Sequence, residues 1–443
     1  MEEYDSQDVV LAPPRRRLGL WSLFALIVAN MVGAGVFTTS GFALADLGRR
    51  DLVLLAWVVG GALALCGAVS YGALARRIPE SGGEYTFLGR TLHPLAGFLA
   101  GWISLTAGFT APIAAAAHGL AAYLEASLPE WASSRDPRWI GTLAIAGAGL
   151  MHGLRFREGV LLQNLAVAAK LVLIAGFVAL GATLRPALSA DVEPSLQAVD
   201  LGAFAVTLVW ISFSYSGWNA AVYLGGEVRR PERNLTRSLL LATLLVTCIY
   251  VALNAVFLYA APREALAGKA EVGAIAAEAL GGPWLRAGLS ALVALALFTS
   301  ISSMVMAGPR VYARMAEDGM LPRVFRMGAE VPAAAIALQT GLAILVLWVS
   351  ALRALLGYIG FTLGLSAAAT VVGLLALRRR EGAERVPIPG YPWVPAIFVT
   401  ATLATAGFMV ARQPMEALLG LLTVGAGFPV YAWTKRISRG RDA

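Results

Sequence analysis

The sequence is poor in charged residues. Asp, Glu, Lys and Arg make up only 14% of the 443 residues, whereas hydrophobic residues make up 58%. A soluble protein of ordinary composition carries about a quarter charged residues. A chain with so few cannot cover its core with polar surface in water. The composition therefore excludes a soluble globular protein and indicates one that uses lipid as its solvent.

Cysteine and histidine are also scarce. The chain has two Cys and three His, and both Cys66 and Cys248 fall inside apolar segments, which argues against a disulfide framework. No His/Cys/Asp cluster has the spacing of a metal site, and no Gly-x-x-x-x-Gly-Lys-Ser/Thr loop is present to bind ATP. We therefore expect no metal, no cofactor and no ATP-driven pump. The lack of a clustered catalytic set argues against an enzyme.

The sequence has instead a succession of apolar runs, most of them close to the ~20 residues needed to cross the hydrocarbon core of a bilayer. These runs predict an all-α membrane protein with about twelve transmembrane helices. We place the helices at residues 21–46, 52–75, 95–123, 139–154, 159–181, 202–228, 237–261, 284–316, 331–350, 354–377, 391–411 and 414–434.

The basic residues fall mainly in alternate loops between these helices. One set of loops holds 24 of the 35 Lys and Arg, the opposite set holds ten, and Lys170 lies within a helix. Cytoplasmic loops carry the excess of Lys and Arg in membrane proteins. We therefore expect both tails, residues 1–20 and 435–443, on the cytoplasmic side of the plasma (inner) membrane. The net charge of +8 is then explained by the orientation of the chain in the membrane, and we expect no nucleic acid partner.

Two of the expected helices carry an interruption near their middle. Residues 30–37 read Asn-Met-Val-Gly-Ala-Gly-Val-Phe, and residues 213–219 read Phe-Ser-Tyr-Ser-Gly-Trp-Asn. Glycine costs about 1 kcal/mol per residue relative to alanine inside a helix. Backbone groups freed at membrane depth are tolerated only beside protein or a water-filled cavity. The interruptions predict two helices that unwind at a binding site, with tight packing through glycine as the alternative.

The interruptions occupy matching places in two blocks of five helices, residues 21–182 and 202–377. The first block enters the membrane from the cytoplasm and the second from outside. Paired broken helices in such blocks are typical of transporters built from inverted repeats. We therefore predict a five-plus-five inverted repeat followed by two C-terminal helices at residues 391–434.

Several motifs resemble the amino acid–polyamine–organocation (APC) superfamily, and together they extend over nearly the whole chain. The most specific is the stretch Tyr71–Trp102, which contains Ile-Pro-Glu-Ser-Gly-Gly-Glu-Tyr at residues 78–85. Gly33–Phe37 is similar to the first-helix motif of the superfamily, Phe213–Leu235 to its sixth helix and cytoplasmic exit, and Arg310–Gly319 to the end of its eighth helix. The resemblance implies broken first and sixth helices and amino acid transport by alternating access.

Within the superfamily, Gly217-Trp218-Asn219 looks closest to the L-type amino acid transporters and their bacterial relatives. Gly226-Glu227 departs from the Glu-Glu pair that these relatives usually carry. The animal members bind a heavy subunit through a cysteine in the outer loop after helix three, and residues 124–138 contain none. We therefore expect a single-subunit carrier of bacterial type with no heavy-chain partner.

A broken helix offers what an amino acid zwitterion needs. Its new N-terminus exposes N–H groups at the positive end of the dipole, and its new C-terminus exposes carbonyl oxygens. We expect the N–H groups of Gly33, Ala34 and Gly35 to hold the carboxylate. We expect carbonyl oxygens to hold the ammonium, and the candidates are those of Val32, Phe213, Ser214 and Ser216. Neither interruption contains a charged side chain, which favours a neutral substrate; a cationic amino acid or a polyamine is the alternative.

Lys170 is the only charged residue in the apolar segment 159–181. It is eleven residues from Gly159, so it lies ~16 Å deep at the rise of an α-helix, and a central lysine costs at least ~2.5 kcal/mol on insertion scales. The resemblance implies that this lysine takes the place of a sodium ion, contacting the broken first helix and hydroxyls of the eighth, here Ser302 and Ser303. A lysine that pairs with an acidic residue for structure only is the alternative.

Phe213 and Trp218 flank the second interruption. We expect them to gate the substrate, although packing against lipid or the core is the usual role of such aromatic residues. His118 and His152 could relay protons, but packed or interfacial histidines are the more common case. The sequence thus predicts a sodium-independent secondary transporter of neutral L-amino acids, working by exchange or proton coupling. Two helix breaks at the same depth are more typical of a carrier with an occluded binding site than of a channel with a continuous pore.

Overall fold

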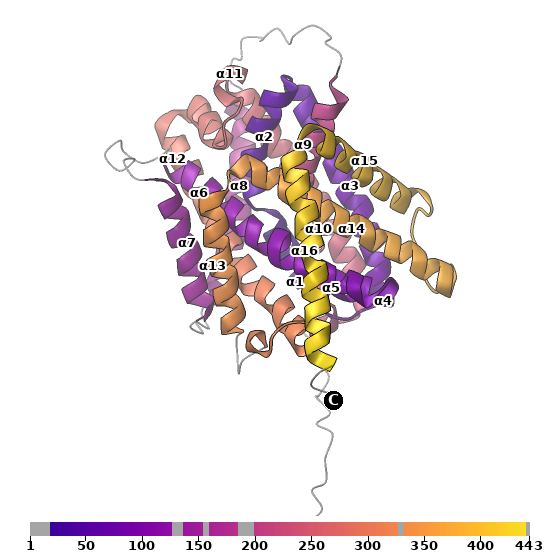
Figure 1. Cartoon of the computed structure of the whole chain (residues 1–443). Helices are drawn as coiled ribbons and strands as arrows, with labels where there is room; N and C mark the ends of the chain where they lie inside the picture. The colour runs from indigo at the N-terminus through magenta and orange to yellow at the C-terminus, as the bar shows by residue number, and fades with distance from the viewer. Residues whose placement is uncertain (1–17, 126–135, 154–158, 185–198, 327–331, 440–443) are drawn as a thin grey trace, which may run out of the picture.

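The computed structural model describes residues 18–125, 136–153, 159–184, 199–326 and 332–439, and within them the chain is helical (Figure 1). These residues form no strand; one isolated bridge joins Leu18 to Val228. Most of the expected N-terminal tail (1–17), the end of the C-terminal tail (440–443) and the stretch 126–135 lie outside the described residues. The last of these is most of the segment whose lack of cysteine argues against a heavy chain.

In the described part of the chain, eight helical segments are long and apolar enough to cross a membrane. They are Leu20–Leu47, Arg50–Arg77, Pro94–Glu125, Pro231–Ala260, Val272–Glu317, Leu352–Glu381, Trp393–Arg412 and Pro414–Lys435. Three shorter apolar helices cover Ala168–Leu184, Leu201–Ser214 and Ala333–Val349. The chain is therefore a helical, multi-pass membrane protein, as its composition predicts.

The first apolar segment is interrupted where the sequence predicts. Helix α1 (Leu20–Met31) ends where the Val32 N–H donates to the Val28 carbonyl at 3.1 Å, and α2 (Ala34–Leu47) begins two residues after Val32. Gly33 lies between them in an extended conformation. The result is a free C-terminus and a free N-terminus deep inside the bundle.

The second interruption follows α9 (Leu201–Ser214), which begins at the N-cap Asp200. Residues 215–219 form a turn, and the chain continues as the 3₁₀-helix η3 (Ala220–Glu227). Gly217 adopts φ +98°, and a Cβ there would lie 2.9 Å from the backbone of Asn30 in α1. Only glycine fits both the positive φ and this close approach between the two broken helices.

The remaining elements follow the expected order. They are α3 (Arg50–Arg77), α4 (Gly83–Thr91), α5 (Pro94–Ile103), the π-helix η1 (Ser104–Thr110), α6 (Ala111–Glu125), α7 (Arg138–Gly153), α8 (Gly159–Leu184), α10 (Pro231–Ala260), α11 (Arg263–Leu266), α12 (Val272–Glu317), η4 (Arg323–Phe325), α13 (Ala333–Val349), α14 (Leu352–Glu381), α15 (Trp393–Arg412) and α16 (Pro414–Arg439). Each span expected from the sequence falls on one or more of these elements.

The structure adds details that the hydrophobic pattern does not contain. Helix α4 lies in a segment we expected to be a loop, and the helix expected at 95–123 contains the π-helix η1. Helix α12 is bent at Gly281 and Gly282, because both residues leave helical conformation.

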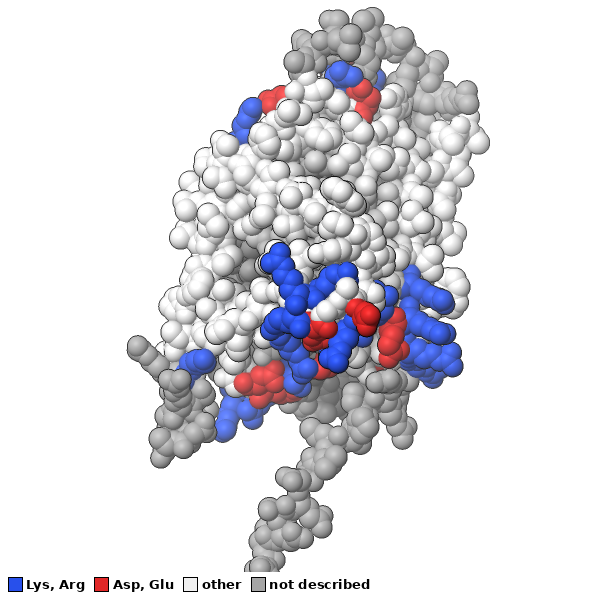
Figure 2. Space-filling model, turned by 90° about the vertical axis from the view of Figure 1, so that its right-hand side faces the viewer, with Lys and Arg blue, Asp and Glu red and all other residues white. Residues whose placement is uncertain are grey.

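Packing places both breaks in the core. Helix α2 contacts α9, and α1 contacts α10, while α7 and α13 lie together on one flank and α14 and α15 on the other (Figure 1). Large apolar side chains remain exposed around the bundle, among them Leu143, Val172 and Val349, as lipid contact requires. Figure 2 shows the charged side chains gathered toward the ends of the molecule, most of them at one end, with an uncharged band between.

Candidate functional site

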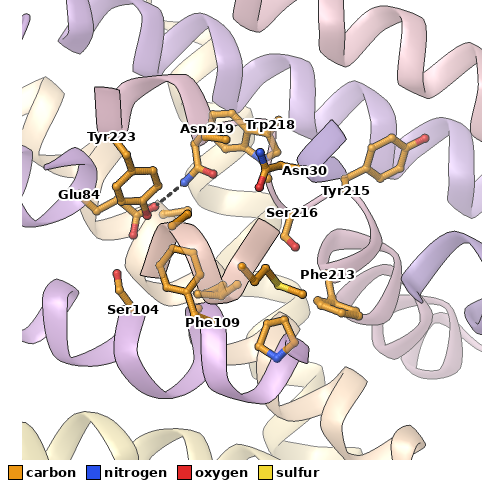
Figure 3. A pocket seen from close by; sticks show the side chains of 18 of the residues that line it. Asn30, Glu84, Ser104, Phe109, Phe213, Tyr215, Ser216, Trp218, Asn219 and Tyr223 are labelled. Atoms are coloured by element: carbon orange, nitrogen blue, oxygen red, sulfur yellow. Dashed lines mark hydrogen bonds between the residues drawn. The ribbon is translucent and has the colours of Figure 1, made fainter. Parts of the chain in front are cut away.

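A cavity of about 890 Å³ opens beside the second interruption. Its wall includes Asn30, Phe213, Ser216, Trp218 and Asn219 (Figure 3). It reaches Arg314 and Glu317 near the end of α12, whose side chains are 59% and 43% exposed. The cavity is therefore open at the end of the bundle where α12 terminates.

The opposite side of the breaks is closed by buried hydrogen bonds. Ser40 of α2 donates to Asn254 Oδ1 of α10 at 2.5 Å, and the indole of Trp57 donates to Ser40 at 2.9 Å. Tyr123 donates to the Phe37 carbonyl at 2.8 Å. All five side chains are buried, so polar groups that would be hydrated in an open channel are instead bonded to one another.

The two broken helices touch where each of them ends or begins. A Cβ added to Gly35 would lie 2.5 Å from the Ser214 Cα, so only glycine permits this approach. The hydroxyl of Tyr250 on α10 donates to the Met31 carbonyl at 2.5 Å and lies 3.1 Å from the Ser214 carbonyl. Tyr250 thus contacts the free C-termini of α1 and α9 together.

Lys170 of α8 is fully buried. Its Nζ donates to the carbonyls of Val32 at 3.0 Å and Ala29 at 3.2 Å, both in the last turn of α1 or just beyond it. An ammonium group buried at a helix C-terminus is stabilised by free carbonyls and by the negative end of the dipole. In the described part of the chain, no Asp or Glu is paired with Lys170, which is evidence against a purely structural ion pair.

The serines expected near Lys170 lie on α12. Ser302 Oγ is 2.8 Å from His152 Nε2, Ser303 is part of the cavity wall, and Ser300 Oγ lies 3.1 Å from the place a Cβ on Gly33 would occupy. Their helix therefore packs against the first interruption. His118 is placed elsewhere, with its Nε2 3.0 Å from the Ser350 carbonyl.

The structure divides the predicted binding residues into two groups. Four of them face the cavity, namely Phe213, Ser216, Trp218 and Ser303. Seven others are buried between helices and do not belong to the wall that the described residues form, namely Val32, Gly33, Ala34, Gly35, Ser214, Lys170 and Ser302. Trp218 packs edge-on against Tyr71 with ring centroids 4.6 Å apart.

Sequence reasoning missed several residues of the site. Glu84 of α4 lies in the cavity wall and is only 5% exposed; burial raises the pKa of its carboxyl, against the effect of hydrogen bonds from Tyr71, Ser366 and Asn219. The sequence did offer a signal for Glu84, because this residue belongs to the most specific motif of the chain, at residues 78–85, shortly before an apolar run. Tyr250 gave no signal, because nothing distinguishes it from other aromatic residues of an apolar helix.

Comparison with known proteins gives consistent matches over almost the full length. A family model described as amino acid permease matches residues 18–421. The serine/threonine exchanger SteT of Bacillus subtilis (strain 168) is 27% identical over 436 residues, 95% of this chain and 97% of that protein. The human large neutral amino acids transporter small subunit 2 is 27% identical, over 94% of this chain and 80% of that one. The mouse Asc-type amino acid transporter 1 is 26% identical, over 94% and 81%.

Proposed function

Because the chain belongs to the amino acid permease family, within the APC superfamily, we propose that it is a sodium-independent secondary transporter that carries neutral L-amino acids by alternating access. The family and the relatives are permeases, transporters and exchangers, so the chain is a membrane transporter and not an enzyme. One observation carries the finer proposal: two interrupted helices meet beside a buried lysine, next to a cavity that opens at the end of the bundle where α12 terminates.

Recognition of the zwitterion falls to the free backbone groups. The N–H groups at the start of α2, from Gly33 to Gly35, hold the carboxylate at the positive end of a helix dipole. The carbonyls of Val32, Phe213, Ser214 and Ser216 are the acceptors for the ammonium. Those of Val32 and Phe213 each accept one hydrogen bond already, and a carbonyl oxygen has two lone pairs. Recognition by backbone alone suits a substrate without net charge.

Lys170 takes the place that a sodium ion would fill. A cation beside the last turn of α1 needs oxygen ligands, and the carbonyls of Ala29 and Val32 already bind the Lys170 ammonium. The hydroxyls of Ser302 and Ser303 complete this site when α8 and α12 move together. A positive charge at this position removes the need for sodium, both in an exchanger and in a proton-coupled carrier.

Alternating access requires a path that is open on one side and closed on the other, as the cavity and the buried bonds around Ser40 provide in this conformation. Phe213 and Trp218 serve as gates beside the substrate. We place both termini in the cytoplasm, so the cavity opens inward, and we assign residues 21–182 and 202–377 to two inverted repeats within about twelve spans. The carrier works as a single subunit in the plasma membrane.

One observation favours a second substrate class. Glu84 puts a carboxyl group in the cavity wall, and a cationic amino acid or a polyamine needs such a partner. Its oxygens already accept three hydrogen bonds from neutral donors, which favours a structural use of this carboxyl over direct binding of a second ammonium.

Uptake into proteoliposomes tests the proposal. Labelled alanine or leucine should enter, unlabelled neutral amino acids should compete, and arginine and putrescine should not. Competition by the cations alone would establish the second substrate class instead. Replacing sodium by choline should leave uptake unchanged, and a strict sodium requirement would contradict the role given to Lys170.

Counterflow separates a carrier from a channel. Preloading the liposomes with unlabelled substrate should accelerate entry of labelled substrate, because the binding site returns loaded. A channel shows no such stimulation, and this result would overturn alternating access.

A further inference from the structure

Glu84 in the first turn of α4 joins three separate elements through its carboxyl group. Tyr71 of α3 donates to Oε1 at 2.6 Å, Asn219 Nδ2 donates to the same oxygen at 3.1 Å, and Ser366 of α14 donates to Oε2 at 2.7 Å. Figure 3 shows the bond from Asn219, which lies between the break at Gly217 and η3. All three donors are neutral.

No Lys, Arg or His within the described ranges forms an ion pair with Glu84, and its titratable neighbours are Tyr71 and Tyr223. A buried carboxyl group without a cation is costly unless its oxygens are hydrogen-bonded. Losing one donor would leave an unsatisfied acceptor in the interior. The three bonds therefore hold the carboxyl in one position.

That position determines which way the Asn219 amide faces. When Glu84 is ionised both of its oxygens can only accept, so the amide must turn its NH₂ group toward Oε1. When Glu84 is neutral, its proton can sit on Oε2, because the Ser366 hydroxyl can accept it. In either state the amide oxygen of Asn219 is left on the other side, and Figure 3 shows it facing the part of the cavity where Ser216 lies.

Building on the transport function proposed above, we propose that Glu84 is a positioning residue that presents the carbonyl oxygen of the Asn219 side chain to the substrate. Such an oxygen binds a donor, either the substrate ammonium or a side-chain hydroxyl. Tyr71 and Ser366 support Glu84 from outside the wall that the described residues form, so they act on the substrate only through it.

Substrate KM in proteoliposomes tests this arrangement. We expect Glu84→Ala to raise KM at least about fivefold with little change in maximal rate, which is the signature of lost ground-state binding. Tyr71→Phe and Ser366→Ala should raise KM in the same direction by a smaller factor. Ser70→Ala is the matched control, because this buried neighbour of Tyr71 bonds only the Cys66 carbonyl of its own helix, and its KM should equal that of the wild type.

A double-mutant cycle decides whether Glu84 acts through Asn219. In an Asn219→Ala background, Glu84→Ala should raise KM no further. Multiplicative effects of the two substitutions would overturn the inference while leaving the transport function intact. If Glu84→Ala does not fold, Glu84→Gln, which keeps an acceptor oxygen, replaces it in the cycle with an intermediate effect expected.

A second readout needs no substrate. In a Cys66→Ala/Cys248→Ala background, Ser216→Cys can be labelled with a maleimide, and Glu84→Ala should accelerate labelling because the segment after the break is no longer held. Equal labelling rates with and without Glu84 would also overturn the inference. This measurement can be made even if the wild type transports no amino acid. It therefore tests the role of Glu84 independently of the proposed transport function.

Discussion

The ammonium nitrogen of Lys170 lies 3.0 Å from the carbonyl oxygen of Val32, at the point where the first broken helix ends. This contact explains how a charged side chain resides in the middle of an apolar bundle. The last carbonyls of α1 have no partner within the helix, and they carry the negative end of its dipole. The break and the lysine therefore stabilise each other.

We expect Lys170→Ala to abolish uptake or slow it more than tenfold, because the free carbonyls of Ala29 and Val32 lose their cation. Initial rates in proteoliposomes measure the effect, and thermal unfolding in detergent checks that the variant is folded. Lys269→Ala, at an exposed position in the segment between α11 and α12, is the control and should transport normally. Uptake at the wild-type rate in Lys170→Ala would remove this residue from the mechanism.

Tyr250→Phe should slow transport about twofold to tenfold, since a buried hydrogen bond contributes roughly 0.5–1.5 kcal/mol and the hydroxyl contacts two helix ends at once. The ring itself stays, so packing is preserved. Tyr358→Phe is a matched control, because its hydroxyl lies 3.0 Å from Thr423 on α16 and far along the chain from both breaks. An equal loss in both variants would argue against a specific role for Tyr250.

Gly35→Ala should prevent transport, because its methyl group would occupy the space of Ser214 at 2.3–2.6 Å. Overpacking typically costs about 1–3 kcal/mol, and here the obstacle includes a backbone atom that cannot rotate away. Gly407→Ala adds the same methyl group in α15 where nothing lies within 4 Å, so it should behave as the wild type. Normal uptake by Gly35→Ala would show that the broken helices can separate.

The stability of Glu84 variants should depend on pH. Burial raises the pKa of the Glu84 carboxyl, so the folded state binds this proton more tightly than the unfolded chain does. That contribution is present at low pH and is lost as pH rises through the folded-state pKa. Glu84→Gln cannot titrate, and its Tm relative to the wild type should therefore increase from about pH 5 to about pH 8.

Much of the fold follows from hydrophobic runs and glycine. The spans were predictable because each apolar segment approaches the thickness of the bilayer, and Gly33 and Gly217 marked the two breaks. The π-helix at residues 104–110 was not predictable, because an extra residue within a helical turn leaves no local signal in the sequence. Helix α4 was missed because a short helix of mixed polarity resembles a loop.

The site was predictable only where a residue differs clearly in charge or flexibility from its neighbours in the sequence. Lys170 was found because a charge inside an apolar run has few explanations, and its carbonyl partners followed from the resemblance. Glu84, Tyr71 and Ser366 come from three elements, and their meeting at Asn219 depends on tertiary packing. Such a constellation has no fixed spacing, so a single sequence cannot reveal it.

The cavity of about 890 Å³ has room for far more than one small amino acid. A ligand with an amino acid head and a bulky tail would enter from the wide end and seat its head at the breaks. The tail would then keep α12 and η3 from coming together, so the enclosure needed for turnover would never form. A transported amino acid and such an inhibitor would thus bind through the same amino acid group at the breaks, and they would differ only in the size of the side chain.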